Sequence, residues 1–158
     1  MKVSGVDPKS GNEVEIQIEN PESGFFDAMS KFEVSDEGIK KLINALNLSA
    51  DSKSLLYTLS KATIRVGEYI IKIGRKILDA VCHVFLEFPM TTFGTVFGGI
   101  VGALISSVPI IGQLLGPIVT PILMALGLVG GLAMDIQDKL LERKISLAVA
   151  TFSPLSGR

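Results

Sequence analysis

The spacing of hydrophobic and polar positions changes along the chain, and these changes delimit four segments. Residues 1–50 combine a two-residue alternation with a short helical pattern, and residues 51–88 keep helical spacing throughout. Residues 89–134 are almost wholly apolar, and residues 135–158 return to helical spacing before a polar tail. Alternation is typical of half-buried strands, and spacing of three or four is typical of amphipathic helices. We therefore predict a mainly α protein that begins with a small β-hairpin.

The first segment, residues 1–50, is predicted to be a small acidic module made of a β-hairpin and a short helix. Apolar and polar side chains alternate over residues 13–19, and residues 3–6 are the candidate partner strand. Ser35 precedes a helical pattern that extends to about Leu46, and serine is a preferred residue at the beginning of a helix. A lone hairpin is marginal in water, so these strands must pair further, within the chain or between neighbouring copies.

The same module is the candidate region for protein partners. Three phenylalanines lie just before its helix: Phe25, Phe26 and Phe32. Burial in a small local core explains such a cluster, and a partner-binding patch is the alternative.

Residues 51–88 are predicted to form one long amphipathic helix. Apolar positions recur with gaps of one, three or four, and most charged positions fall on the opposite face. Asp51 or Ser52 is the expected cap, and Gly67 and Gly74 lie on one side, where they predict a close crossing with another helix. Such a helix can lie along a membrane surface, and the alternative is a helix in the bundle of a soluble assembly.

The third segment predicts a membrane helical hairpin, and the alternative is a hairpin buried in the core of a soluble helical bundle. The run Phe88–Met134 contains no charged residue and no histidine. About 20 apolar residues cross the roughly 30 Å of bilayer hydrocarbon, so the run suits two short spans, placed at about 91–108 and 118–134. The turn between them is predicted from its prolines and glycines: Pro109, Gly112, Gly116 and Pro117.

Basic residues flank this hairpin on both sides. They are Lys72, Arg75 and Lys76 before it, and Lys139, Arg143 and Lys144 after it. Positive residues favour the cytoplasmic side, so both termini are expected to be cytoplasmic or interior-facing, with these side chains near the membrane surface. Because the turn is itself apolar, a shallow or re-entrant hairpin is an alternative.

Small residues recur at four-residue intervals within the hairpin and predict close helix packing. The first stripe is Gly94, Gly98, Gly102 and Ser106, and a second pair is Gly127 and Gly131. The pattern resembles the glycine zippers of several small two-span membrane proteins, which implies self-association into a homo-oligomer. The alternative is intramolecular, with the two spans packing against each other.

The fourth segment is predicted to be an amphipathic helix over about 135–150 that can pack antiparallel to the long helix. Its tail, residues 153–158, is predicted to be a loop.

Composition agrees with this division. The 158 residues are 47% hydrophobic, an ordinary fraction, yet the mean hydropathy of +0.47 is high because aliphatic residues concentrate in the hairpin. The net charge of −1 divides into an acidic first segment and a basic remainder, and it argues against a nucleic-acid partner. No segment resembling a secretory signal peptide begins the chain.

Candidate chemistry is sparse. The single cysteine, Cys82, excludes an intramolecular disulfide and a cysteine-cluster metal site, and the expected role of its side chain is packing. The single histidine, His83, lies between Asp79 and Glu87 at four-residue spacing, which fits either a solvated face or a pH-responsive group. Phosphate-binding, metalloprotease and hydrolase motifs are absent, so we expect no catalytic residue, no metal and no cofactor.

Two functions fit these patterns. One is a non-enzymatic integral membrane protein that self-associates through its hairpin, as a structural or pore-forming component of a membrane assembly such as a virus particle or secretion machine. The other is a soluble-to-membrane pore-forming or lysis effector that inserts the hairpin. The hairpin is similar in composition to that of colicin-type toxins, which supports the second function. In both, the lipid bilayer is the main partner.

Overall fold

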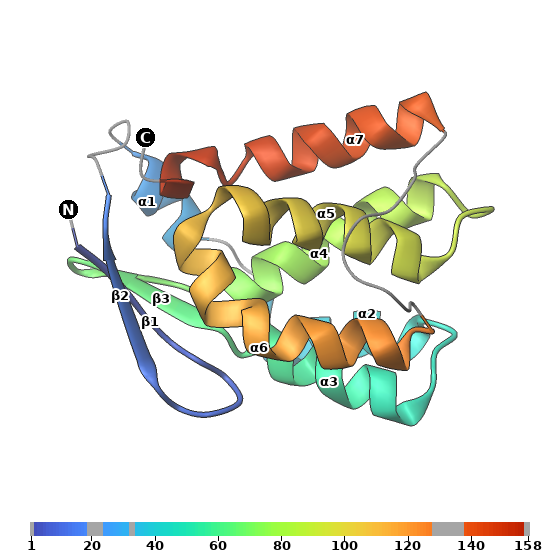
Figure 1. Ribbon diagram of the computed structural model, residues 1–158, viewed down its shortest axis with the longest axis horizontal. Helices are drawn as coiled ribbons and strands as arrows, with labels where there is room; N and C mark the ends of the chain where they lie inside the picture. Colours follow the sequence, from blue (N-terminus) through green and yellow to red (C-terminus); the bar gives the residue numbers. More distant parts are fainter. Residues whose placement is uncertain (1, 19–23, 32–33, 128–137, 157–158) are drawn as a thin grey trace.

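The computed structural model describes residues 2–18, 24–31, 34–127 and 138–156, and within them it is mainly helical with one small antiparallel sheet (Figure 1). The elements, in chain order, are β1 (Lys2–Val6), β2 (Glu13–Gln17), α1 (Phe25–Ser30), α2 (Asp36–Ala45), α3 (Ala50–Ser60), β3 (Thr63–Val66), β4 (Tyr69–Ile71), α4 (Ile73–Glu87), α5 (Phe93–Ser107), α6 (Pro109–Ala125), α7 (Lys139–Ala150) and the short 3-10 helix η1 (Ser153–Ser156).

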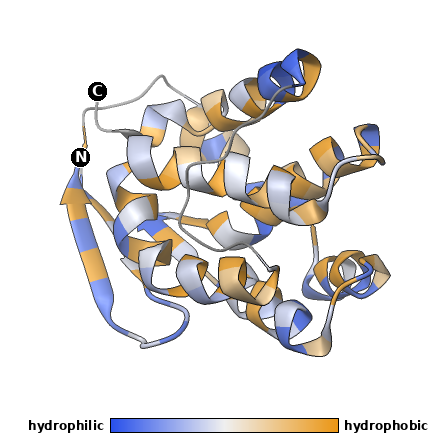
Figure 2. Ribbon diagram, turned by 45° about the vertical axis from the view of Figure 1, so that its right-hand side comes forward, coloured by the Kyte–Doolittle hydropathy of each residue, from blue (hydrophilic) through white to orange (hydrophobic). Residues whose placement is uncertain are grey.

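The predicted hairpin is confirmed as β1 and β2, and it belongs to a larger sheet in the order β2-β1-β3-β4. Strand β1 pairs antiparallel with both β2 and β3, so that Val3 lies opposite both Ile16 and Val66. The hairpin therefore finds its further partner within the chain. Alternate residues such as Val3 and Ile64 are buried beneath the sheet while Arg65 is exposed, and Figure 2 shows the same alternation of hydropathy in the strands near the N-terminus.

The prediction of one helix over 51–88 is wrong. The segment forms α3, the β3–β4 hairpin and α4, and the cap of α3 is Ser49, whose Oγ accepts a hydrogen bond from the backbone N–H of Ser52. Two residues connect β3 to β4, and the first of them, Gly67, has a φ of 58°. Such a positive φ suits glycine in a tight hairpin turn, so Gly67 reverses the chain and does not mark a helix crossing.

Gly74 does mark a close approach between helices. It lies in the first turn of α4, where a Cβ atom would collide with the carbonyl oxygen of Leu59 near the end of α3. Its own N–H donates to the carbonyl of Ala62 at 3.0 Å. The β3–β4 hairpin thus brings the end of α3 and the beginning of α4 into direct backbone contact.

The helix predicted after Ser35 is confirmed as α2, and the Ser35 hydroxyl accepts the N–H of Gly38 at 2.9 Å. Of the three phenylalanines, Phe26 is buried on α1 and stacks on Tyr69 of β4 with ring centroids 6.4 Å apart. Phe25 is half-buried beside it, and Phe32 lies outside the described residues. The stacking of Phe26 on Tyr69 holds α1 against the sheet, which agrees with the interpretation of this cluster as a local core.

The elements form a helical stack with the sheet covering one end (Figure 1). Helix α7 lies along one side, α5 and α4 lie next, then α6, and α2 with α3 form the opposite side. The tail contains η1, and both Phe152 and Leu155 are fully buried. The loop predicted over 153–158 is therefore wrong for residues 153–156, and the first residues predicted for α7, 135–137, lie outside the described residues.

Candidate functional site: the buried apolar hairpin

The apolar run predicted as a membrane hairpin forms the helical pair α5 and α6, at the centre of the fold. Phe97, Ile100 and Leu104 of α5 and Ile111 and Leu114 of α6 are fully buried. Helix α5 contacts α4, α6 and α7, and α6 contacts α3, β1, β2 and η1. Amphipathic helices and the sheet thus surround the pair with apolar side chains.

Within the described residues, no helix combines the length and the apolar character needed to cross a bilayer. The predicted spans also differ from the observed helices. Helix α5 falls within the predicted span 91–108, whereas α6 takes in most of the predicted turn and ends at Ala125. Residues 128–134, the end of the second predicted span, lie outside the described residues.

The turn of the hairpin is at Val108, and the prediction of a turn over Pro109–Pro117 is wrong. Pro109 occupies the first position of α6, where its missing N–H costs little, and Gly112, Gly116 and Pro117 lie inside the helix. A Cβ atom at position 112 would lie 2.8 Å from the carbonyl oxygen of Ile105. Gly112 therefore permits the beginning of α6 to pack directly on the end of α5.

Two prolines interrupt the backbone hydrogen bonds of α6. Pro117 and Pro121 both lie inside the helix, and neither can donate to the carbonyl four residues earlier. Pro121 lies twelve residues after the first residue of α6, Pro109, and so is not in the first turn of a helix that begins at about residue 118. The stability of α6 thus depends on the packing of its apolar face more than on its own backbone.

The glycine stripe on α5 is buried inside the single chain. Gly94, Gly98 and Gly102 are all buried, while Ser106 is exposed and its Oγ donates to the carbonyl of Gly102 at 3.0 Å. In this state the three glycines are not exposed to a second copy of the chain. Homo-oligomerisation through the stripe therefore requires the fold to open.

Only one member of the second glycine pair, Gly127, is among the described residues. Gly127 has a φ of 84° and lies directly after Leu126, the C-cap of α6, a position where glycine commonly ends a helix. Its N–H donates to the carbonyl of Met124 at 3.0 Å. Gly131 lies outside the described residues.

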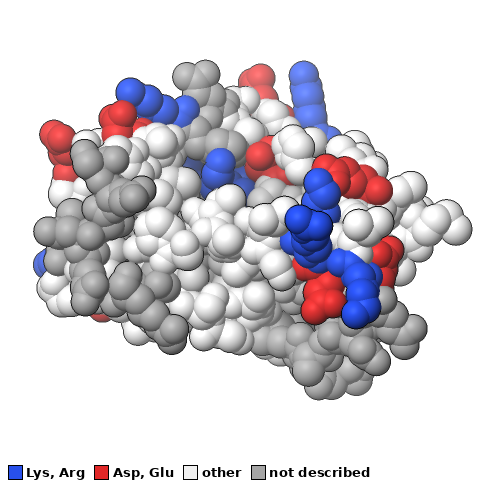
Figure 3. Space-filling view, turned by 90° about the horizontal axis from the view of Figure 1, so that it is seen from above, with Lys and Arg blue, Asp and Glu red and all other residues white. Residues whose placement is uncertain are grey.

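The six basic residues predicted to flank a membrane hairpin do not form one surface. Lys72 is exposed just before α4, Lys76 is half-buried, and the Arg75 side chain is only 16% exposed. Lys139, Arg143 and Lys144 are exposed on the first half of α7, where Lys144 pairs with Glu87 at 3.3 Å. Figure 3 views the molecule from the side of α7 and shows acidic and basic side chains close together at the end where α7 begins.

Arg75 belongs to a polar clasp, which we define as Asp36, Tyr57, Arg75 and Lys40. The Tyr57 phenol donates to the Asp36 carboxylate at 3.0 Å, and the Arg75 guanidinium lies 3.4 Å from the same carboxylate. Arg75 also donates to the carbonyl of Val34 at 3.3 Å, and Lys40 pairs with Asp36 at 3.2 Å. The clasp joins α2, α3 and α4. Hydrogen bonding from Tyr57, followed by the charges of Lys40 and Arg75, lowers the pKa of Asp36 below its usual value.

Cys82 and His83 do not form a reactive pair. Burial raises the pKa of the Cys82 thiol to about 11, with a smaller contribution from the Asp79 carboxylate, so the thiol is protonated at neutral pH. His83 is exposed, and its Nδ1 lies 2.8 Å from the backbone carbonyl of Asp79 and 3.4 Å from the carboxylate. The packing role expected for Cys82 agrees with its burial in α4.

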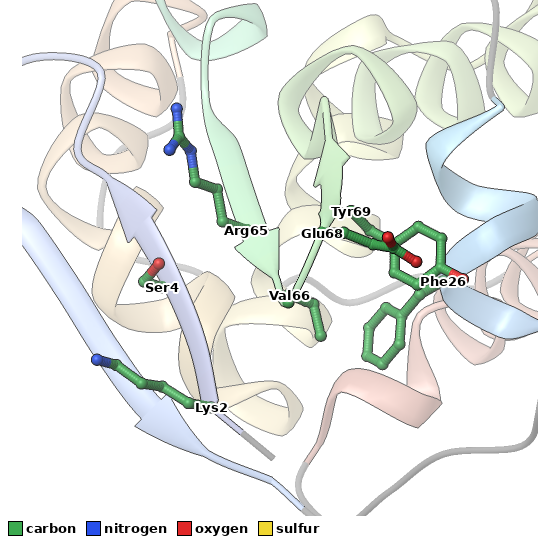
Figure 4. Close-up of a pocket in the computed structure, with 8 residues that line it drawn as sticks. Lys2, Ser4, Phe26, Arg65, Val66, Glu68 and Tyr69 are labelled. Carbon is green, nitrogen blue, oxygen red and sulfur yellow. The ribbon is translucent and has the colours of Figure 1, made fainter.

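A hollow of about 780 Å³ lies beside the sheet and α1 (Figure 4). Lys2, Ser4 and Arg65 come from the sheet, Glu68 and Tyr69 from the β3–β4 hairpin, and Phe26 from α1. Lys2 is paired with Glu15 at 3.0 Å. The side chains in Figure 4 point in different directions and do not converge on one point. Among the described residues, no cluster of His, Cys, Asp or Glu is arranged to hold a metal ion.

In comparisons with known proteins, no family model, no curated protein and no solved structure matches this chain.

Proposed function

We propose that this protein is a non-enzymatic membrane effector that keeps the α5–α6 hairpin buried in one state and inserts it into a lipid bilayer in another. The observation that carries the proposal is the position of the hairpin. A pair of helices without charged residues forms the centre of the fold, while charged side chains are carried by the elements around it.

Burial of the hairpin supports this function over residence in a membrane as a structural component. A resident hairpin would present its apolar side chains to lipid, whereas here α4, α7, α3 and the sheet cover them. Burying one large apolar side chain contributes roughly 1.5–3 kcal/mol, so the covering elements stabilise the buried state strongly. A bilayer offers the hairpin an equivalent apolar environment.

Insertion requires longer helices than the buried state contains. At about 1.5 Å per residue, α5 with 15 residues and α6 with 17 residues are about 22 and 25 Å long, short of the roughly 30 Å of hydrocarbon. The sequence permits extension, because residues 88–107 and 109–134 are uncharged. Pro89 would then lie in the first turn of the longer helix, where proline is tolerated.

The glycine stripe gives the inserted state a means of self-association. Gly94, Gly98 and Gly102 are buried before insertion and would become available on one face of α5 once the covering elements leave. Small residues at this spacing permit close helix packing in lipid. We propose that the inserted hairpins form a homo-oligomer through this face.

A charge placed at an exposed position of the hairpin tests the proposal. Thr120 is exposed on α6, so Thr120→Lys leaves the buried state intact but costs roughly 2.5–3.5 kcal/mol at the centre of a bilayer helix. Ser146→Lys, at an exposed position of α7, is the matched control.

The readout is dye release from phosphatidylcholine–phosphatidylglycerol vesicles across pH 5–8, with thermal unfolding measured in parallel. We expect release by the parent protein and by S146K, strongly reduced release by T120K, and equal thermal midpoints. Absence of release by the parent protein, or equal release by T120K, would contradict insertion. Recovery of the parent protein only in the membrane fraction would instead support the resident component.

A further inference from the structure

The last turn of α6 is held by a side chain from another helix. Ser52, in the first turn of α3, is 1% exposed, and its Oγ donates to the carbonyl of Ala125, the last residue of α6, at 3.2 Å. The Ser49 hydroxyl lies 2.9 Å from the same Oγ and is the donor of that pair, because Ser52 gives its own proton to Ala125. Figure 1 shows the end of α6 beside the beginning of α3, opposite the sheet. Ser52 thus occupies a carbonyl that a longer α6 would use for its own backbone N–H.

The backbone beyond Ala125 also leaves the helical conformation. Gly127 has a φ of 84°, and its N–H donates to the carbonyl of Met124, three residues earlier instead of four. A right-handed helix requires a negative φ, so α6 cannot continue through Gly127 in this conformation. A Cβ atom at position 127 would meet no atom within 4 Å, so an alanine there would be strained by its backbone alone.

These two features limit the length of α6 while the hairpin is buried. With 17 residues, α6 is about 25 Å long, short of the roughly 30 Å of bilayer hydrocarbon. The sequence after Ala125 is uncharged as far as Met134, so no charge opposes a longer helix in an apolar environment. The end of α6 is therefore set by Ser52 and Gly127, and both can be changed without altering the apolar face of the helix.

We propose that Ser52 and Gly127 form a helix stop, which keeps α6 short in the buried state and whose release allows α6 to reach the length needed to cross a bilayer. Release breaks the hydrogen bond from Ser52 to Ala125 and moves Gly127 to a helical φ, a change that glycine makes without a steric penalty. The Ala125 carbonyl then accepts an N–H of its own helix, as a backbone group in hydrocarbon must. This inference rests on the proposed function, because it names the step that controls insertion of the hairpin.

Alanine at position 127 gives the sharpest test. Gly127→Ala is strained at a φ of 84° and favours a helix over glycine, so it should shift the equilibrium toward the long α6 by roughly twentyfold to a hundredfold. Gly116→Ala is the first control, because it makes the same change at a position that is helical whether α6 is short or long. Gly67→Ala is the second control, because it creates a similar backbone strain in the β3–β4 turn.

Substitution of Ser52 tests the other half of the stop. Ser52→Ala removes the donor to the Ala125 carbonyl, so it should shift the same equilibrium toward the long α6 by roughly threefold to tenfold. Ser54→Ala is the matched control, because Ser54 is an exposed serine two residues further along α3.

The length of α6 is measured without vesicles, by hydrogen exchange of the peptide covering residues 126–134 during a titration with dodecylphosphocholine micelles. We expect the peptide of the parent protein to gain protection at high detergent concentration. G127A and S52A should gain it at lower concentration, and all three control variants should behave like the parent. Dye release from phosphatidylcholine–phosphatidylglycerol vesicles, measured in parallel, should be faster in the same two variants.

The two readouts distinguish this inference from the proposed function. Absence of protection in the parent protein at any detergent concentration, or equal midpoints for G127A and G116A, would overturn the helix stop even if the vesicles leak. A shift in G67A as large as that in G127A would also overturn it, because lower stability alone would then explain the change. Earlier protection in G127A, without dye release by any variant, would support the stop and contradict insertion.

Discussion

Gly112 of α6 lies against the backbone of Ile105 in α5, so that a Cβ atom at position 112 would be only 2.8 Å from the Ile105 carbonyl oxygen. This contact lies one turn from Val108, where the apolar hairpin reverses direction. Gly116, one turn further along α6, has no atom within 4 Å of the corresponding Cβ position. The two glycines therefore have different roles, although they lie one turn apart on the same helix.

Alanine substitution separates these roles. Gly112→Ala forces α6 away from α5 and should lower the free energy of unfolding by about 1–3 kcal/mol, the usual cost of overpacking. Gly116→Ala should raise it by up to about 1 kcal/mol, because alanine favours the helix over glycine. Chemical denaturation of both variants measures the difference. Equal effects would show that the α5–α6 contact at Gly112 is not tight.

The polar clasp predicts an acid-sensitive contribution to stability. Because the pKa of Asp36 is lowered in the folded state, its contribution is present above the unfolded value and is lost as the pH falls through the folded pKa. Tyr57→Phe removes the hydrogen bond that lowers the pKa most while keeping the ring. We expect the Asp36 pKa, followed by carboxyl NMR, to rise toward its usual value in Y57F. An unchanged Asp36 pKa would contradict this role of Tyr57.

Cys82 should report on opening of the fold. Its thiol is buried and its pKa is raised to about 11, so alkylation at pH 8 should be slow in the folded protein and fast in urea. Mass spectrometry of the labelled protein measures both rates. Rapid labelling under native conditions would contradict the burial of this face of α4. If the hairpin leaves the fold on vesicles, lipid should also accelerate labelling.

The β3–β4 turn supplies another local test. Gly67→Ala places a side chain at a φ of 58° and should destabilise the protein by roughly 1–2 kcal/mol. Glu68→Ala, at the neighbouring turn position where φ is not positive, should change the stability by less than about 0.5 kcal/mol. Thermal unfolding distinguishes them, and similar midpoints for both variants would argue against a strained turn at residue 67.

The sequence predicted those elements whose local signals agree with one another. The alternation around Ile16 and the serine cap before α2 are local signals, and each indicates one kind of element. The apolar run likewise predicted a helical hairpin, and the structure contains one. Its surroundings were not predictable, because the same uncharged helices suit a bilayer or the interior of a bundle.

The β3–β4 hairpin was not predicted because the spacing of its apolar residues is the same as that of an amphipathic helix. Ala62, Val66, Tyr69 and Ile73 are three or four residues apart, as on the face of an amphipathic helix. Two signals favoured strands: the β-branched residues Thr63, Ile64 and Val66, and the glycine placed between Val66 and Tyr69. Pairing of β3 with β1 then favours strands over a helix. Strand β1 lies about sixty residues earlier in the sequence, so the spacing of neighbouring residues could not reveal this partner.

The sheet order has a consequence for synthesis on the ribosome. Strand β1 lies between β2 and β3, so the sheet cannot be completed until residue 71 has left the exit tunnel, and α5 follows only from residue 93. The surface that receives the beginning of α6, where Gly5 lies close to Leu114, can therefore exist before the hairpin has left the exit tunnel. Segments emerge at roughly 5–20 residues per second. The nascent chain can thus assemble an intramolecular chaperone for its own most aggregation-prone segment.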